Sequence, residues 1–187
     1  MKLINLNKQK KEHITFDQKG ETYVVFFHNV SGKLTFEITE PDIKLYMYGL
    51  YTGHKTDEFY IETIQLHKAP GSLSDLLIKG VFEDKSKFIY QGLIRLEKEA
   101  QQSHAYQKNQ NLIMSKGVFV DSRPYLEILA NDVFCTHGST TGKLSEDQLL
   151  YARTRGLTAN DAEQMLVQGF IDEVYQKVQS HNPEFTI

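Results

Sequence analysis

One cysteine and one histidine are the residues whose types and spacing are best suited to chemistry. Cys135 and His137 stand two positions apart in the segment NDVFCTHGSTTG. If this segment is a strand, the two side chains point to the same face, and a thiol and an imidazole can meet. Such a pair acts as a cysteine nucleophile with its base, or binds a soft or borderline metal ion. A lone cysteine is also often a small buried residue, and a histidine before glycine often belongs to a turn, so this structural alternative stays open.

Other candidate groups carry weaker signals. The segment Gly138–Lys143, GSTTGK, is similar to a phosphate-binding loop. Leu144 stands where that loop needs a hydroxyl group for magnesium, so nucleotide binding is not expected. His54, His67 and His104 are isolated in the sequence, which is typical of histidines that form structural hydrogen bonds. The cysteine and histidine pair therefore remains the first candidate site.

The elements that must position this pair are short strands. From Tyr23 onward, runs rich in β-branched and aromatic residues alternate with turn-forming clusters, and apolar and polar residues alternate in Leu34–Ile38. The hexapeptide KGVFED at Lys79–Asp84 recurs as KGVFVD at Lys116–Asp121, an offset of 37 residues. A period in the thirties made of short strands favours a β-solenoid. A β-sandwich and a β-barrel remain open alternatives on this pattern.

The two ends of the chain differ from this central region. Residues 1–20 are polar and rich in lysine, which predicts a leader outside the core, and residues 21–144 form the predicted β-region. The chain has 187 residues, a net charge of −3 and one cysteine, which fits one domain in a reducing compartment such as the cytoplasm. The chain has no excess of basic residues, so its charge does not indicate a nucleic acid partner. We also expect neither a signal peptide nor a membrane span, because no apolar run approaches about 20 residues.

Residues 145–187 are predicted to be helical. The segment Ser145–Gln148 has the capping-box form, and Gly156 is placed to end the first helix. Thr158 or Asn160 is placed to cap a second helix. This second helix carries a broad apolar stripe, whose main expected role is packing against the sheet. Binding of a partner protein by part of the stripe is the alternative. The stripe consists of Leu166, Val167, Phe170, Ile171, Val174 and Val178.

Four motifs between His67 and Gly156 resemble a known family. They are AYQKNQNL at Ala105–Leu112, PYLEI at Pro124–Ile128, DVFCTHGSTTG at Asp132–Gly142 and LLYARTRG at Leu149–Gly156. In this order and spacing they resemble the conserved core of the SufB/SufD family. Members of this family are the scaffold subunits of the SUF iron–sulfur cluster assembly machinery. Family members are longer and have further turns before the matched part, so this chain is either naturally short or truncated.

The resemblance implies an architecture and a set of partners. It implies a right-handed parallel β-helix followed by a C-terminal helical segment, which docks a SufC-type ATPase through residues 145–187. It also implies that the β-helix pairs with a SufB/SufD-type subunit, as a hetero- or homodimer. The chain is closer to SufD, because Lys108 and Asn109 stand near the position where the SufB type has a functional cysteine. His137 corresponds to a histidine implicated in cluster assembly on the SufD side.

The expected function is therefore that of a scaffold subunit and not of an enzyme. Ferrous iron or a transient iron–sulfur cluster would be bound by His137, with Cys135 nearby. A single thiol cannot hold a cluster that usually needs four protein ligands, so the remaining ligands would come from a partner subunit. Two alternatives remain open. One is a small cysteine-dependent hydrolase or transferase that uses Cys135 and His137, and the other is a β-helical interaction module without cluster chemistry.

Overall fold

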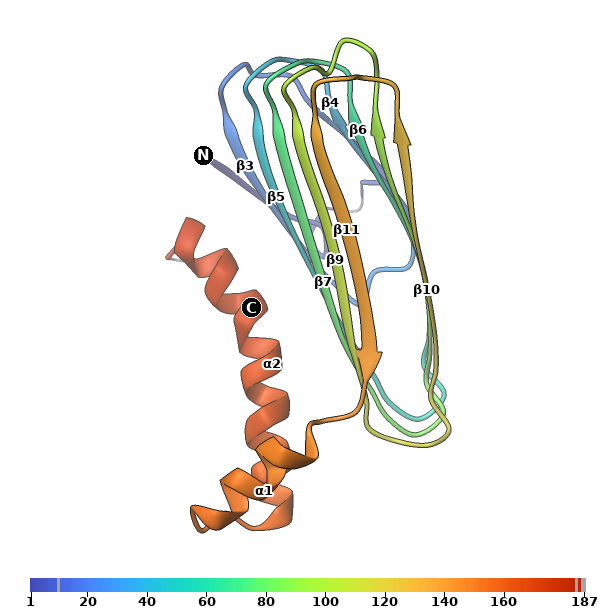
Figure 1. Ribbon diagram of the computed structural model, residues 1–187, viewed down its shortest axis with the longest axis vertical. Coiled ribbons are helices and arrows are strands. Elements are labelled where there is room, and N and C mark those ends of the chain that lie inside the picture. The colour runs from blue at the N-terminus through green and yellow to red at the C-terminus, as the bar shows by residue number, and fades with distance from the viewer. Residues whose placement is uncertain (10, 184, 186–187) are drawn as a thin grey trace.

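The fold consists of two parallel sheets and two C-terminal helices, as the computed structural model shows for residues 1–9, 11–183 and 185 (Figure 1). Within these described residues, odd-numbered strands form one sheet and even-numbered strands form the other. The odd sheet contains, in order, β1 (Lys2–Asn5), β3 (Thr22–His28), β5 (Lys44–Gly53), β7 (Leu73–Phe82), β9 (His104–Ile113) and β11 (Phe134–Gly142). The even sheet contains β2 (His13–Phe16), β4 (Gly32–Ile38), β6 (Glu58–His67), β8 (Lys87–Leu96) and β10 (Phe119–Ile128).

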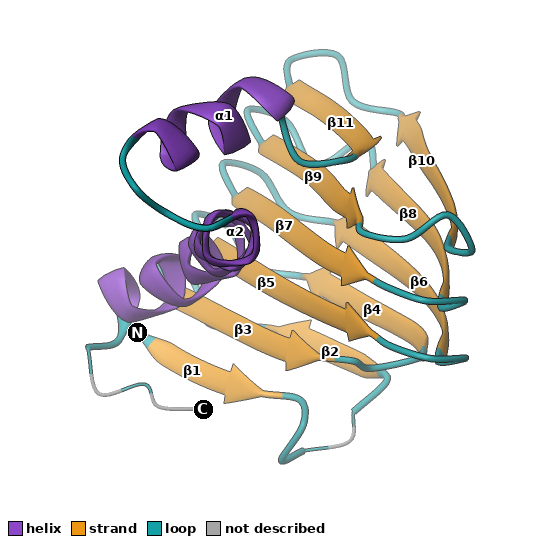
Figure 2. Ribbon diagram, turned by 90° about the horizontal axis from the view of Figure 1, so that it is seen from below, coloured by secondary structure: helices purple, strands orange, loops and turns teal. Residues whose placement is uncertain are grey.

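Consecutive strands alternate between the two sheets, so each turn of the chain adds one strand to each sheet (Figure 2). The register gives the repeat, because Lys44 pairs with Leu73, Leu73 with His104, and His104 with Phe134. These partners are 29, 31 and 30 residues apart. The arrangement is a parallel β-solenoid, which confirms the predicted β-helix and rules out the sandwich and the barrel.

The repeated hexapeptide that suggested a solenoid is not its structural repeat. Lys79–Asp84 includes the end of β7 in the odd sheet, whereas Lys116–Asp121 leads into β10 in the even sheet. Lys79 pairs in register with Gln110. Each turn contains two strands and two bends. Similar short segments can therefore recur at spacings other than the full repeat. The predicted β-solenoid is confirmed, but the hexapeptide repeat does not mark its structural period.

Residues 1–20 include the first strands of the solenoid, and the prediction of a polar leader was wrong. Lys2–Asn5 pairs with β3, and His13–Phe16 pairs with β4. Ile14 and Phe16 are buried and alternate with polar residues, as expected for a strand with one face toward a core. The strands β1 and β2 therefore cover the turn that begins at β3.

The interior of the first turns is a packed apolar core. Phe36, Met47 and Tyr51 are fully buried inside it. Burial of each large apolar side chain contributes about 1.5–3 kcal/mol to folding. Gly49 is required by this packing, because a Cβ atom there would lie 2.5 Å from the ring of Phe27. The core of the early turns therefore depends on large rings and on small residues facing them.

The C-terminal segment forms the helices α1 (Glu146–Thr154) and α2 (Ala159–His181), as predicted. The Ser145 side chain accepts a hydrogen bond from the backbone N–H of Gln148. Thr158 caps α2 by accepting a hydrogen bond from the backbone N–H of Asp161, and Asn160 lies inside the helix. Gly156 follows α1 with a positive φ of 97°, a conformation that glycine adopts without strain.

Helix α2 covers part of the outer face of the odd sheet (Figure 2). Val174 and Val178 are buried against an outer cluster on β3, β5 and β7 that includes Phe26 and Leu77. The C-terminal half of the predicted apolar stripe is therefore used within the chain. No helix among the described residues combines the length and apolar character that a bilayer span requires.

A buried lysine fastens α2 to the sheet. The side chain of Lys79 is almost fully buried on β7, and its ammonium group donates a hydrogen bond of 3.1 Å to the backbone oxygen of Phe170. The same group pairs with the carboxylate of Glu173 and lies 4.0 Å from the centre of the Phe170 ring. These contacts satisfy a charge that would be unfavourable in an unpaired buried position. They hold the middle of α2 against the sheet.

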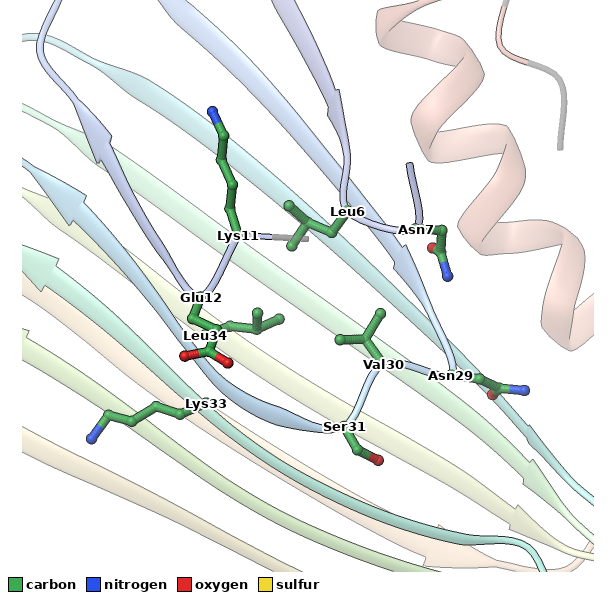
Figure 3. A pocket seen from close by; sticks show the side chains of 9 residues that line it. All are labelled: Leu6, Asn7, Lys11, Glu12, Asn29, Val30, Ser31, Lys33 and Leu34. Atoms are coloured by element: carbon green, nitrogen blue, oxygen red, sulfur yellow. The ribbon is translucent and has the colours of Figure 1, made fainter. Parts of the chain in front are cut away.

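A cavity of about 670 Å³ opens at the N-terminal end of the solenoid, which is the end opposite β11. Leu6, Val30 and Leu34 point toward one another in it (Figure 3). Asn7 and Asn29 line its edge and form hydrogen bonds with backbone atoms of neighbouring strands. Polar and charged residues line this cavity together with these apolar ones, and the candidate cysteine and histidine lie at the other end of the molecule.

Candidate functional site

Cys135 and His137 lie on β11, the last strand of the odd sheet in the described part of the chain. Cys135 pairs with Ala105 and His137 pairs with Gln107 on β9. Ala105 and Gln107 are buried inside the solenoid, and side chains of in-register parallel strands stack in the same direction. The two candidate residues therefore share the inward-facing side of β11, as the sequence predicts. They form the open end of the solenoid.

The thiol of Cys135 lies in an apolar setting. It packs against a buried cluster formed by Ile94, Leu96, Ala100 and Ala105. Burial in this cluster raises the pKa of the Cys135 thiol to about 11, because a thiolate is poorly solvated there. A catalytic cysteine needs the opposite shift, since the thiolate is the nucleophile. The geometry therefore disfavours Cys135 as a nucleophile and agrees with a partly buried structural thiol.

His137 is exposed on the inward side of the open turn, where Ser139 and Thr141 follow it at alternate positions. Among the described residues, no three or more His, Cys, Asp or Glu side chains are gathered closely enough to hold a metal ion. His137 and Cys135 therefore do not form a complete site within this part of the chain. An imidazole in this position is available to a ligand or to a second molecule.

A layer of buried amides lies directly beneath this open turn. Gln107, Asn109 and Asn111 all point inward from β9, and they are paired in register with His137, Ser139 and Thr141. The sequence resemblance contains these amides, but their inward alternation only becomes visible in the register. A period of two within the QKNQN motif is the signal that would have indicated it.

The amide of Gln107 is held by hydrogen bonds to residues of earlier strands. The Gln107 side chain donates a hydrogen bond of 3.2 Å to the backbone oxygen of Gly92 and accepts one of 3.4 Å from Gln65. A Cβ atom at Gly92 would lie 2.4 Å from the Gln107 side-chain nitrogen, so glycine makes room for this amide. The interior of the late turns is thus polar and closely packed at these positions.

His67 is buried inside the solenoid. The sequence predicts a structural role for it. Its Nε2 atom forms a hydrogen bond of 2.8 Å with the hydroxyl of Ser74. Burial lowers the pKa of His67 to about 4, because the charged imidazolium is disfavoured away from water. The residue is neutral near pH 7 and belongs to the polar interior, where its partner Ser74 lies one layer below Ala105 in the stack that ends at Cys135. Its predicted structural role agrees with these contacts.

The other sequence candidates lie apart from the open turn or have no catalytic geometry. The residues Gly138–Gly142 of the GSTTGK segment belong to strand β11 and not to a loop at a helix start, so they do not form a phosphate-binding loop. His54 is exposed, and its Nδ1 atom forms a hydrogen bond of 3.2 Å with a carboxylate oxygen of Glu83. His104 lies on the outer face of β9 and stacks on Phe134. None of these histidines lies beside His137 in the register.

Large apolar side chains surround the open turn. Phe134 on β11 is 53% exposed and Phe119 on β10 is 52% exposed. As the outermost strands of the described sheets, β10 and β11 each have one edge without a paired neighbour. Exposed apolar residues beside a free strand edge are typical of an interaction surface. The remaining large apolar residues that are exposed in this region are Tyr125, Leu126, Ile128 and Leu129.

A second exposed apolar group lies on the helices. Leu150 and Tyr151 on α1 are 61% and 62% exposed, and Met165 on α2 is 49% exposed. Only Met165 adjoins the predicted apolar stripe, whereas Val174 and Val178 of that stripe are buried. Leu166, Val167, Phe170 and Ile171 of the stripe are partly exposed, so part of it stays accessible. The odd sheet covers its C-terminal half, where Val174 and Val178 lie.

Comparisons with known proteins agree with the fold and with the motifs. The family model for the SufBD core domain of the SUF system for FeS cluster assembly matches residues 22–170. The iron–sulfur cluster assembly protein SufD of Escherichia coli is 39% identical over 98 residues, which cover 52% of this chain and 23% of the relative. A SufBD family protein of Mycobacterium leprae is 29% identical over 174 residues, which cover 89% of this chain and 43% of the relative.

A SufBD family protein of Synechocystis is 31% identical over 116 residues, which cover 62% of this chain and 25% of the relative. The chain thus spans less than half the length of these curated relatives. The match of the family model covers most of the chain, including the open turn and the start of α2. The chain therefore belongs to the SufBD core family of the SUF iron–sulfur cluster assembly system.

Proposed function

We propose that this chain is a scaffold subunit of a SUF-type complex in the cytoplasm, and that it presents His137 to a second subunit at the open end of its solenoid. The observation that carries this proposal is the position of His137. It is exposed on the inward side of the last described turn, above a layer of buried amides and beside exposed apolar residues. A histidine placed only for folding would be expected inside the stack, as His67 is.

The chemistry of an imidazole suits this role. A neutral imidazole binds ferrous iron, and an exchangeable bond allows iron or a nascent cluster to be passed on. The iron or the cluster is the cargo of the scaffold. Iron–sulfur clusters usually need four protein ligands, and the inward side of the open turn offers the exposed imidazole of His137 with one partly buried thiol nearby. The other ligands would therefore come from a SufB/SufD-type partner bound at β10 and β11.

The helices supply the second proposed interface, which is for a SufC-type ATPase. Leu150, Tyr151 and Met165 expose apolar surface on α1 and α2, while Lys79 and Val174 hold α2 on the solenoid. A helical segment with one anchored half and one exposed apolar group is suited to docking a folded partner. In this proposal ATP hydrolysis belongs to the partner, and this chain has a binding role.

Reconstitution with purified partners tests the role of His137. The chain is combined anaerobically with a SufC-type ATPase and a SufB-type subunit, and iron and acid-labile sulfide in the complex are measured. His137→Ala should leave the complex assembled but reduce its cluster content at least severalfold. His104→Ala is the matched control, because His104 is exposed on the outer face of the neighbouring strand.

Two outcomes would contradict the proposal. Equal cluster content in His137→Ala and in the wild-type chain would remove His137 from the site. The chain would then be an interaction module without cluster chemistry. Failure of the wild-type chain to co-purify with either partner, with α1 and α2 intact, would contradict the scaffold role as a whole. A double variant, Leu150→Asp with Tyr151→Asp, should abolish only binding of the ATPase.

A further inference from the structure

The strand that carries His137 is held differently from the other strands of the odd sheet. Its side chains are exposed except for Cys135, which is partly buried. In a strand with one buried face, the apolar pattern fixes the register, and a slip by one residue turns every side chain to the opposite face. In β11 such a slip would turn His137 outward and Phe134 inward. Burial of apolar side chains therefore does not protect the register of this strand.

Two hydrogen bonds between side chains act on the inward face of β11. The Asn111 side chain donates a hydrogen bond of 3.2 Å to the hydroxyl of Thr141. The hydroxyl of Ser139 donates one of 2.9 Å to the hydroxyl of Ser122 on β10. Ser139 and Thr141 lie on the same side of the strand as His137, so both bonds require the register in which His137 points inward.

The amide of Asn111 is itself fixed from below. Its nitrogen also donates a hydrogen bond of 2.7 Å to the side-chain oxygen of Asn109. Asn109 in turn donates a hydrogen bond of 3.3 Å to the backbone oxygen of Ile78 on β7. Asn109 and Asn111 are both buried, so a shift of Thr141 would leave a buried donor without its partner. The chain of hydrogen bonds connects β7, β9 and β11.

Aromatic contacts on the outside do not replace these hydrogen bonds. Phe134 lies 6.0 Å from the rings of His104 and Tyr106, measured between ring centres, and it remains half exposed. These contacts hold only the first residue of β11. After Cys135, β11 is held by its backbone pairing with β9, and the side-chain contacts of Ser139 and Thr141 add to it on the inward face.

We propose that Asn111, acting through Thr141 and together with the Ser122–Ser139 bond, locks the register of β11 and thereby points His137 into the open end of the solenoid. Asn111 is a positioning residue in this scheme. Its functional meaning rests on the role proposed for His137, but the lock itself involves no iron and no partner. The QKNQN motif then has two tasks, which are to fill the late turns and to orient the strand above them.

The test uses the single cysteine of the chain as a reporter of register. The rate of Cys135 alkylation by N-ethylmaleimide and the amide exchange of residues 134–142 are measured at fixed pH. Thr141→Val removes the hydroxyl at nearly constant volume and should raise both rates about tenfold, the factor expected for one lost hydrogen bond. Thr141→Ser keeps the hydroxyl and should restore both rates to near the wild-type values. Thr140→Val is the matched control, because Thr140 points to the opposite side of β11.

Clear results would overturn the proposal. The lock does not exist if Thr141→Val leaves both rates unchanged, or if Thr140→Val raises them as much as Thr141→Val does. Asn111→Leu extends the test inside the core. Because that variant also breaks the buried bonds of Asn109, the substitutions at position 141 decide between the lock and its absence. A failed lock would leave the His137→Ala result untouched, so the two proposals can fail separately.

Discussion

The two ends of the solenoid are built from the same repeat but differ in what fills them. The first turns enclose large apolar side chains such as Phe16 and Phe36, which are fully buried. The last turns enclose amides, and the final strands leave His137 and a group of apolar residues exposed. One backbone architecture thus supplies a stable core at one end and an open, polar, chemically available end at the other. Under the role proposed for His137, stability and function would be divided along the axis.

The largest effect on stability is expected from truncating a buried aromatic side chain in the first turns. Phe36→Ala should lower the free energy of unfolding by about 3–5 kcal/mol, because it removes a fully buried ring and leaves a cavity. Urea denaturation followed by circular dichroism measures this loss. A change below about 1 kcal/mol would mean that the first turns do not form the main core, and the contrast between the two ends would be broken.

The next effect concerns the thiol at the open end. Since burial raises the pKa of Cys135 to about 11, very little thiolate exists at pH 7. Alkylation by iodoacetamide should be at least about 100-fold slower in the folded chain than in urea, where the thiol has its ordinary pKa. Quantifying the free thiol over time by mass spectrometry gives both rates. Rapid, selective alkylation of the folded chain would revive the cysteine-dependent enzyme as an explanation.

A third effect concerns the polar interior and its dependence on pH. Burial lowers the pKa of His67 to about 4, so the unfolded chain binds a proton between about pH 6.5 and pH 4 that the folded chain does not. This contribution to stability is complete above pH 6.5 and is lost as the pH falls toward 4. Between pH 7.5 and pH 5 the loss should be about 2 kcal/mol.

The matched variant for this effect is His67→Gln, which keeps a polar side chain but does not titrate. Unfolding free energies at pH 7.5 and pH 5 are compared for both chains, because other groups also titrate in this range. His67→Gln should show a pH dependence that is smaller by the amount assigned to His67. Equal pH dependence in both chains would mean that His67 is accessible to protons in the folded state.

The smallest effect on stability is expected at the rim of the open turn. Ile128→Ala removes an exposed side chain of β10 and should change the free energy of unfolding by about 1 kcal/mol or less. The same variant should weaken binding of a SufB-type subunit, because it removes part of the proposed interface. Calorimetric unfolding and a binding titration separate the two quantities. A loss as large as that of Phe36→Ala would show that this rim belongs to the core.

Local signals predicted much of the fold, and the exceptions have physical causes. The sequence predicted the helix N-caps at Ser145 and Thr158, because capping depends on residues three positions apart. The strand runs were readable from their alternation. The first turn was missed because Ile14 and Phe16 form only a short alternating pattern among lysines. The solenoid repeat was also misjudged, since one hexapeptide ends a strand of the odd sheet and the other begins a strand of the even sheet.

The site was predicted less completely than the fold. The alternation of β11 placed Cys135 and His137 on one face, and the structure agrees. The sequence did not predict that the Cys135 thiol is shielded while His137 is exposed. The apolar cluster around Cys135 comes from β8, β9 and the bend between them. The apolar stripe of α2 showed the same limit. Its periodicity was correct, but only the packing decided that Val174 and Val178 serve the sheet and that Met165 stays exposed.

Local sequence patterns predicted most of the strands, both helices and the side chains that alternate within them. These properties depend on neighbouring residues, whose spacing along the chain sets the direction of their side chains. The folded arrangement of the strands was needed to show that Asn111 lies beneath Thr141, that His137 stands at an open end and that Cys135 is shielded. Those relations join strands about 30 residues apart, and their register depends on the packing of all the turns between the two ends.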